Sequence, residues 1–169
     1  MTEDITIGKK LKAKFPEAVI DGKTFRGELT INIHKDFIQK AAGFLYEDNE
    51  TAFDYLSDLC GVDLSRLDGS NNFEVVYHLY SMKLNHRVRL KVKIPASNPS
   101  IDTVTNVWKT ADWHEREAYD MFGIIFNGHP NLQRILTPEG FKGHPLRKDY
   151  PLKGRQPETL RGIYREGKQ

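Results

Sequence analysis

The sequence predicts an α+β fold, in which a mostly antiparallel sheet packs with helices and an extended, irregular C-terminal arm follows. Residues 86–94 alternate strictly between apolar and basic side chains, as in a strand with one buried face. Residues 35–47 carry an apolar stripe with helical spacing. From Ile124 onward neither period survives, and Gly, Pro, His and Arg recur instead. We therefore predict a globular domain over 1–123 and a docking arm over 124–169.

The N-terminal third predicts two helices with a pair of strands between them. Residues 4–14 can form a short helix, and residues 35–47 form the second one. Strands are expected over 18–23 and 27–33, because apolar and polar residues alternate in the second of these segments. The dipeptide Asp21-Gly22 predicts the turn of this region.

The middle of the chain predicts three more strands. Residues 53–64 have no clear period, and their later part, 59–63, is interpreted as a strand. Residues 73–82 are apolar on both faces, which indicates a central strand covered on both sides. A loop over 81–85 then joins this strand to 86–94 as a hairpin.

A helix is predicted directly before the irregular arm. Asp112 is followed three residues later by Glu115, which resembles a capping box at the start of a helix. Gly123 is typical of the residue that ends such a helix. A shorter helix is expected upstream, over 103–109.

The helix that ends near Gly123 is also the densest cluster of polar side chains. Ion pairs at a buried junction are the favoured interpretation, since Arg116 and Asp120 are four residues apart and can pair. The His-x-x-x-His spacing of many zinc sites is absent. We therefore assign no catalytic, cofactor-binding or metal-binding residue. The alternative metal or acid–base site would use His114, Glu115, Glu117 and Asp120.

Two histidines and one cysteine are the remaining candidates for chemistry. His129 and His144 each lie between Gly and Pro, a setting that favours turn formation and hydrogen bonding over metal ligation. Cys60 is the single cysteine, and alone it can neither form an internal disulfide nor hold zinc or an iron–sulfur cluster. We interpret it as a buried apolar residue of a protein from the reducing cytosol.

Charge is unevenly distributed along the chain. Residues 129–169 contain nine Lys/Arg and four Asp/Glu, a net charge of +5, whereas residues 1–128 contain sixteen and nineteen, a net charge of −3. A basic arm would attract an acidic partner surface, and a solvated tail is the alternative. The basic face of 86–94 could contact a phosphate backbone, but no aromatic residues interleave with its cations, so a solvated face is favoured.

Four motifs of the helix and the arm occur together and in a fixed order. They are the run 115–124, Gly-His-Pro at 128–130, Arg-Ile-Leu at 134–136 and the run 143–151. Together they resemble the signature of the thirty-kilodalton subunit family of respiratory complex I, whose bacterial members are called the C subunit. Segments 73–79 and 85–92 add to the resemblance. Gln133, where the family more often has Arg or Lys, and Thr137, which replaces the usual Met, depart from the pattern.

The resemblance implies a cofactor-free scaffold subunit in the hydrophilic arm of a proton-translocating NADH:quinone oxidoreductase (complex I). The chain would be part of an enzyme without having an active site of its own, and flavin and iron–sulfur clusters would lie in partner subunits. Its partners would be the quinone-site subunit, which is the D subunit of complex I and helps form the quinone pocket, and other hydrophilic-arm subunits. It would lie on the cytoplasmic side of a bacterial membrane and contact the membrane only through the complex.

Alternatives remain open at this point. One is the same scaffold in a related complex that uses ferredoxin or another electron donor, and the others are a nucleic-acid-binding module and a metal-dependent hydrolase. The interface residues expected from the resemblance and from the polar clusters are Glu115, Arg116, Glu117, Asp120, His129, Arg134, His144, Arg147, Lys148, Asp149 and Tyr150.

Overall fold

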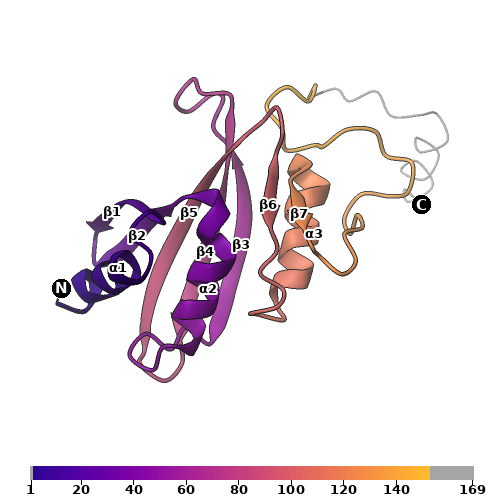
Figure 1. Cartoon of the computed structure of the whole chain (residues 1–169). Helices are drawn as coiled ribbons and strands as arrows, with labels where there is room; N and C mark the ends of the chain where they lie inside the picture. Colours follow the sequence, from indigo (N-terminus) through magenta and orange to yellow (C-terminus); the bar gives the residue numbers. More distant parts are fainter. Residues whose placement is uncertain (1, 153–169) are drawn as a thin grey trace.

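A five-stranded mixed sheet forms the centre of the computed structural model, which describes residues 2–152, with side chains from Ile7 onward (Figure 1). The strand order is β1-β2-β5-β4-β3, and all neighbours are antiparallel except the parallel pair β2 and β5. The predicted α+β fold with a mostly antiparallel sheet is therefore confirmed. The strands are β1 (Val19–Phe25), β2 (Glu28–Ile33), β3 (Tyr55–Asp63), β4 (Asn72–Ser81) and β5 (His86–Pro95).

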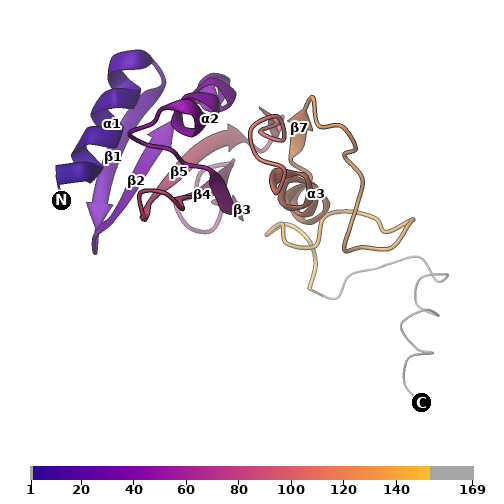
Figure 2. The same cartoon turned by 90° about the horizontal axis from the view of Figure 1, so that it is seen from below.

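Helices cover one face of this sheet. Helices α1 and α2 lie together over that face, and α3 packs against β3 at the opposite edge of the sheet from β1 (Figure 2). The apolar core lies between these helices and the inward side chains of the strands. The helices are α1 (Thr2–Lys14), α2 (Ile38–Glu47), which follows the short 3₁₀ turn η1 (Lys35–Phe37), and α3 (Ala111–Phe122).

The strand pattern of β5 is as predicted, and that of β4 differs in part. Val88, Leu90, Val92 and Ile94 are buried on one face of β5. Strand β4 lies between β5 and β3, so the prediction that 73–82 is a central strand is confirmed, but no helix of residues 2–152 covers its outer face (Figure 2). On its outer face His78 and Tyr80 are only half-buried.

The turn between β1 and β2 lies at Arg26-Gly27, so the prediction of a turn at Asp21-Gly22 is wrong. Arg26 and Gly27 both have positive φ, 52° and 80°, as a two-residue hairpin turn of type I′ requires. Asp21 and Gly22 lie inside β1, beside a register shift that follows Val19. The Asp-Gly pair therefore marks a strand irregularity instead of a turn.

Strand β3 begins at Tyr55, four residues before the predicted start. A register shift between Leu56 and Asp58 interrupts the alternation of its side chains. This bulge explains why the sequence shows no clear period there.

The two features predicted just before α3 are wrong. Residues 103–109 form a turn, with the N–H of Trp108 bonded to the carbonyl of Val104 at 3.0 Å, and no helix. Thr110 is the N-cap of α3, without a side-chain cap, and Asp112 lies inside the first turn. The predicted C-terminal end is confirmed, since Gly123 follows the helix with φ of 75°.

A short strand directly follows α3, although no strand was predicted there. Strand β7 (Ile125–Asn127) pairs in parallel with β6 (Ser100–Asp102). Ile124 and Phe126 are buried in the core. Three residues are too few to reveal a period of two in a sequence, which accounts for the error. The division of the chain at residue 123 stays a prediction.

We expect Gly61→Ala to lower the free energy of unfolding by about 1–3 kcal/mol. A Cβ atom at Gly61 would lie 2.6 Å from Cδ2 of the buried Phe122 ring, so α3 would have to shift on β3. Gly43→Ala in α2 is the control, because nothing lies within 4 Å of its added Cβ, and it should stabilise by about 0.5–1 kcal/mol. Urea unfolding measures both changes, and equal stability of the Gly61 variant and the wild type would contradict this packing of α3.

Candidate docking site between helix α3 and the C-terminal arm

The part of the arm that follows β7 and that the structure describes, residues 128–152, runs back along α3 and towards the end of β3 (Figure 1). It contains no helix or strand after β7. Backbone N–H and C=O groups of such a segment need partners outside it wherever water is excluded. Two buried carboxylates, Asp120 and Asp63, supply these partners.

Asp120 is the first anchor, and its side chain is fully buried at the end of α3. Its Oδ2 accepts the backbone N–H groups of Ile135, Leu136 and Thr137 at 3.1, 2.8 and 2.8 Å. Its Oδ1 accepts from Nη1 of Arg134 at 2.9 Å and from the hydroxyl of Thr137 at 2.5 Å. One carboxylate thus fixes four consecutive arm residues to the helix.

These donors determine the charge state of Asp120. Burial raises the pKa of its carboxyl, but hydrogen bonds from the hydroxyl and N–H of Thr137 and the N–H groups of Leu136 and Ile135 outweigh burial, and the net pKa lies below the ordinary 3.8. Because the pKa of Asp120 is lower in the folded than in the unfolded protein, its ionised form stabilises the folded arm above a pH of about 3.8. This stabilisation is lost as the pH falls through the folded-state pKa. The anchor is therefore an ionised carboxylate at neutral pH.

His144 caps the C-terminal end of the same helix. Its Nδ1 lies 2.9 Å from the carbonyl oxygen of Asp120, so this nitrogen carries the proton. The N–H of Leu146 donates to the carbonyl of Met121 at 3.1 Å. The ring lies so close to Gly123 that a Cβ there would approach Nε2 to 2.7 Å. The arm thereby satisfies carbonyls that a helix end leaves unpaired.

The second anchor, Asp63, lies at the end of β3. Its Oδ2 accepts the N–H of Lys148 at 2.8 Å, and the guanidinium of Arg66 donates to the carbonyl of Lys148 at 3.1 Å. The guanidinium of Arg147 lies 4.8 Å from the ring centre of Phe73, a cation–π contact. Burial raises the pKa of Asp63, and the bonds from Lys148 and Ser65 lower it to below its ordinary value.

A third buried carboxyl, Glu115, lies on the other side of α3. Its Oε1 accepts the N–H of Val104 at 2.7 Å, and its Oε2 lies 2.5 Å from the hydroxyl of Thr103. Burial raises the pKa of Glu115 to about 7, against these hydrogen bonds and with the help of the negative charge of Asp112. The side chain that was predicted to belong to a capping box thus fixes the segment before the helix.

Arg116 and Asp120 do not pair, so the predicted ion pair between them is wrong. Asp120 pairs with Arg134, while Nε of Arg116 donates to the carbonyl of Gln133 at 3.1 Å. The guanidinium of Arg116 also lies 5.2 Å from the ring centre of the exposed Trp113.

His129 is packed against the start of α3. Its side chain is fully buried, its Nε2 lies 3.2 Å from the carbonyl of Asp112, and its Nδ1 accepts the N–H of Asn131 at 3.0 Å. One ring nitrogen thus bonds within the turn and the other bonds to α3, which agrees with the turn formation and hydrogen bonding predicted from the Gly-His-Pro setting.

Other predicted interface residues lie apart from these anchors. Glu117 is exposed on α3, and the exposed Asp149 is 4.0 Å from Nε of Arg147. Tyr150 stacks on Phe141 with ring centres 6.1 Å apart. Their predicted role at a subunit interface stays a prediction.

Sequence reasoning missed Asp63, Thr103 and Arg66. Asp63 and Lys148 are 85 positions apart, and no local pattern links them. Thr137 had a signal, because it departs from the usual Met of the resembling family. Its hydroxyl donates to Asp120, which explains what the departure adds.

The anchored arm exposes three leucines. Leu136 is 61% exposed, Leu146 is 51% exposed and Leu152 is fully exposed. Asp120 holds the backbone N–H of Leu136, and the carbonyl of Met121 holds that of Leu146, so these leucines cannot turn inward without breaking those bonds. A partner could cover such leucines at little further cost in conformational entropy, because their backbone is already fixed.

No group of three His, Cys, Asp or Glu side chains in residues 2–152 has a geometry able to hold a metal ion. In the same range no helix has the length and apolar character that crossing a membrane requires.

Comparison with known proteins gives one consistent family. Residues 31–156 match the family described as respiratory-chain NADH dehydrogenase, 30 kDa subunit. The NADH-quinone oxidoreductase C subunit of Roseiflexus sp. (strain RS-1) is 47% identical over 150 residues, which cover 89% of this chain and 85% of that protein. The protein of the same name from Citrifermentans bemidjiense is 43% identical over 162 residues, covering 96% and 98%.

Solved structures agree with this result. A trypsin-resistant fragment of Nqo5 matches 77% of this chain and 99% of its own length, with a TM-score of 0.61 and 28% identity. A chain of the membrane-bound sulfane sulfur reductase, an archaeal respiratory membrane complex, matches 95% of this chain and 91% of its own length, with a TM-score of 0.73 and 25% identity.

We expect Asp120→Asn to release the arm while the sheet stays folded. The amide that replaces the carboxylate has no charge to pair with Arg134, and its single oxygen cannot accept all the backbone N–H groups. The free energy that holds the arm on α3 should fall by about 3 kcal/mol. Hydrogen exchange at the amides of Ile135, Leu136 and Thr137 should therefore accelerate about a hundredfold. Glu117→Gln is the matched control, since it makes the same chemical change at an exposed position of α3. Unchanged protection in the Asp120 variant would rule out this anchor.

We expect Glu115→Gln to flatten the pH dependence of stability. Because the folded-state pKa of Glu115 is raised from 4.5 to about 7, the folded protein binds more protons than the unfolded one in this window, and stability falls as the pH rises through it. Between pH 5 and 8 the wild type should lose about 2–3 kcal/mol relative to the variant. Urea unfolding at both pH values measures the difference. Parallel losses in both proteins would show that Glu115 is ionised throughout.

Proposed function

The chain belongs to the family of the 30 kDa subunit of respiratory-chain NADH dehydrogenase, and from this membership we propose that it is a cofactor-free scaffold subunit in the hydrophilic arm of a proton-translocating NADH:quinone oxidoreductase. In this proposal the chain packs against the quinone-site subunit, the neighbour that helps form the quinone pocket. Flavin and iron–sulfur clusters belong to partner chains. The protein lies on the cytoplasmic side of the bacterial membrane and contacts the membrane only through the complex.

The observation that carries the proposal is the leucine surface of the anchored arm, formed by Leu136 and Leu146. The Asp120 anchor holds the backbone at Leu136, and the bond to Met121 holds it at Leu146, so these side chains are presented to a partner at little further cost in conformational entropy. Arg134 and Arg147 lie beside them and are engaged within the chain. The surface is thus preorganised and mainly apolar, as expected for a permanent subunit contact.

The role proposed for this surface is mechanical. Electron transfer requires that the clusters of other subunits stay at a fixed distance from quinone. A rigid sheet with an arm fixed at Asp120 and Asp63 can hold the quinone-site subunit in such a position. An obligate interface of this kind buries on the order of 2,000 Å² or more. The reaction itself would take place in partner chains.

A second candidate is the same scaffold in a complex with another electron donor. It is supported by the likeness to a chain of an archaeal sulfane sulfur reductase, which has a TM-score of 0.73 over 95% of this chain. The leucine surface would serve either complex, because the arm contacts the neighbouring subunit and not the donor.

We expect the double variant Leu136→Glu, Leu146→Glu to lose the quinone-site subunit. The tagged chain would be purified from gently solubilised native membranes, and the co-purifying subunits would be quantified by mass spectrometry. Two buried charges without partners should reduce recovery of the quinone-site subunit at least about tenfold. The melting temperature of the isolated chain should not change, since both leucines are exposed.

Ile20→Glu is the matched control for this experiment. Ile20 is 62% exposed on β1, at the edge of the sheet opposite the arm, so this variant should recover the quinone-site subunit like the wild type. Recovery of NADH- and flavin-binding subunits would identify the NADH-linked complex, and their replacement by other donor subunits would identify the second candidate. Full recovery of the quinone-site subunit by the double variant would refute the leucine surface as its docking site.

A further inference from the structure

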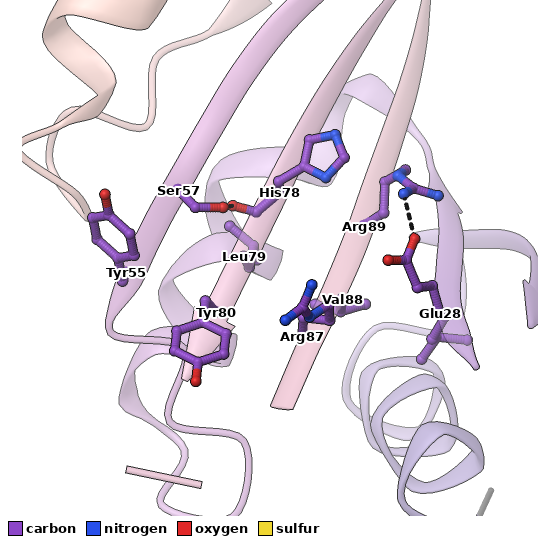
Figure 3. Close-up of a pocket in the computed structure, with 10 residues that line it drawn as sticks. Glu28, Tyr55, Ser57, His78, Leu79, Tyr80, Arg87, Val88 and Arg89 are labelled. Carbon is purple, nitrogen blue, oxygen red and sulfur yellow. Dashed lines mark hydrogen bonds and ion pairs between the residues drawn. The ribbon is translucent and has the colours of Figure 1, made fainter. Parts of the chain in front are cut away.

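The face of the sheet that the helices leave uncovered contains a hollow of about 340 Å³ (Figure 3). Among residues 2–152, no helix covers the outer face of β2, β5 and β4 (Figure 2). The hollow lies over these strands and β3. Its polar and aromatic lining includes Tyr55, His78, Tyr80, Arg87, Arg89 and Glu28.

Two tyrosines and an arginine form a row across three strands of this face. Tyr80 on β4 is in register with Tyr55 on β3 and with Arg87 on β5. The guanidinium of Arg87 lies 5.9 Å from the ring centre of Tyr80, and Figure 3 shows these two side chains next to each other. Tyr55 is 43% exposed. Tyrosine and arginine are among the residue types most enriched where proteins bind one another tightly.

Arg87 differs from the other cations of β5 in its charge partners. Nη2 of Arg89 is 2.7 Å from a carboxylate oxygen of Glu28. Lys91 and Lys93 are similarly paired with Glu74 and Asp68, at 2.7 and 3.3 Å. Arg87 forms no ion pair with any carboxylate in the described part of the chain. Among the four cations 87, 89, 91 and 93 of β5, Arg87 is therefore the one whose charge is available to a partner.

We propose that this outer sheet face, defined by Tyr55, Tyr80 and Arg87, is a docking surface for an acidic segment of a partner protein. A carboxylate of that segment binds the guanidinium of Arg87, and an apolar side chain next to it fills the hollow beside the two tyrosine rings. A charge-assisted bond to a guanidinium held over an aromatic ring is strong and directional. The surface is separate from the leucines of the arm, so the inference goes beyond the proposed function.

The same charges disfavour other occupants. A nucleic acid would bring its phosphates close to Glu28 and Glu74, and these carboxylates already neutralise two of the four cations of β5. The chain's own residues 153–169 contain five Lys/Arg and two Asp/Glu, so they have the wrong charge for Arg87. A protein segment with one or two carboxylates matches the single available guanidinium.

The test places the photoreactive amino acid p-benzoylphenylalanine at position 55 of the full chain in its native membranes. After irradiation, mass spectrometry identifies the crosslinked peptide. We expect a segment of another protein with Asp or Glu next to the crosslinked residue. Arg87→Glu should reduce the crosslink yield at least about tenfold, and Arg87→Gln should reduce it less. Changing the crosslinked carboxylate of the partner to Lys should restore the yield with Arg87→Glu.

Lys40→Glu is the matched control. Lys40 also lies over an aromatic ring, 5.7 Å from the ring centre of Phe37, but it belongs to α2 on the helical side of the sheet, so its reversal should leave the yield unchanged. The proposal is overturned if position 55 crosslinks to a second copy of this chain, to nucleic acid or to a segment without carboxylates, or if it does not crosslink. A parallel probe at position 136 tests the arm, so failure of one surface is distinguished from failure of the other.

Discussion

The carboxylate of Asp120 is the interaction on which the arrangement of the arm depends. An extended segment without secondary structure cannot satisfy its own backbone, and its few apolar residues cannot form a core. Asp120 accepts three consecutive N–H groups, which replace the hydrogen bonds that a strand partner would provide. Because the side chain comes from the last turns of α3, the arm is fixed to a helix that packs on β3. Asp63 repeats the same solution at the end of β3.

In this arrangement different groups of the arm bind its own domain and face outward. The N–H groups of residues 135–137 and the guanidinium of Arg134 bond to Asp120 of its own domain, and Leu136 and Leu146 are exposed. In a typical surface loop the reverse holds, since apolar side chains pack inward and polar groups face water. The uncovered sheet face is organised differently, because there a guanidinium and two tyrosines project from regular strands. The fold thus presents two chemically distinct surfaces, one apolar at the arm and one cationic and aromatic at the sheet.

Features of the fold and of the site could be predicted from the sequence where the residues that determine them are close together in the chain. The period of β5 and the end of α3 at Gly123 could be predicted, because each is determined by residues close in the sequence. The pairing of β6 with β7 joins residues 25 positions apart, and each strand has only three residues. The site followed the same rule: Asp120 was identified as an interface residue, but its true partner lies 14 positions away, in the arm. A helical spacing of four favoured Arg116 instead.

Glu115 and Asp120 show how one helix can hold two buried carboxyls in opposite states. They are five positions apart, which turns their side chains about 140° apart around the helix axis. Glu115 meets two neutral donors and a nearby Asp112, so burial dominates and its pKa is raised to about 7. Burial raises the pKa of Asp120 too, but hydrogen bonds from the hydroxyl and N–H of Thr137 and from the N–H groups of Leu136 and Ile135 bring it below its ordinary value. Burial raises the pKa of both carboxyls, and the hydrogen bonds outweigh it at Asp120 but not at Glu115. Helix α3 therefore binds the arm through the ionised carboxylate of Asp120. It binds the segment at Thr103 and Val104 through Glu115, which can be neutral.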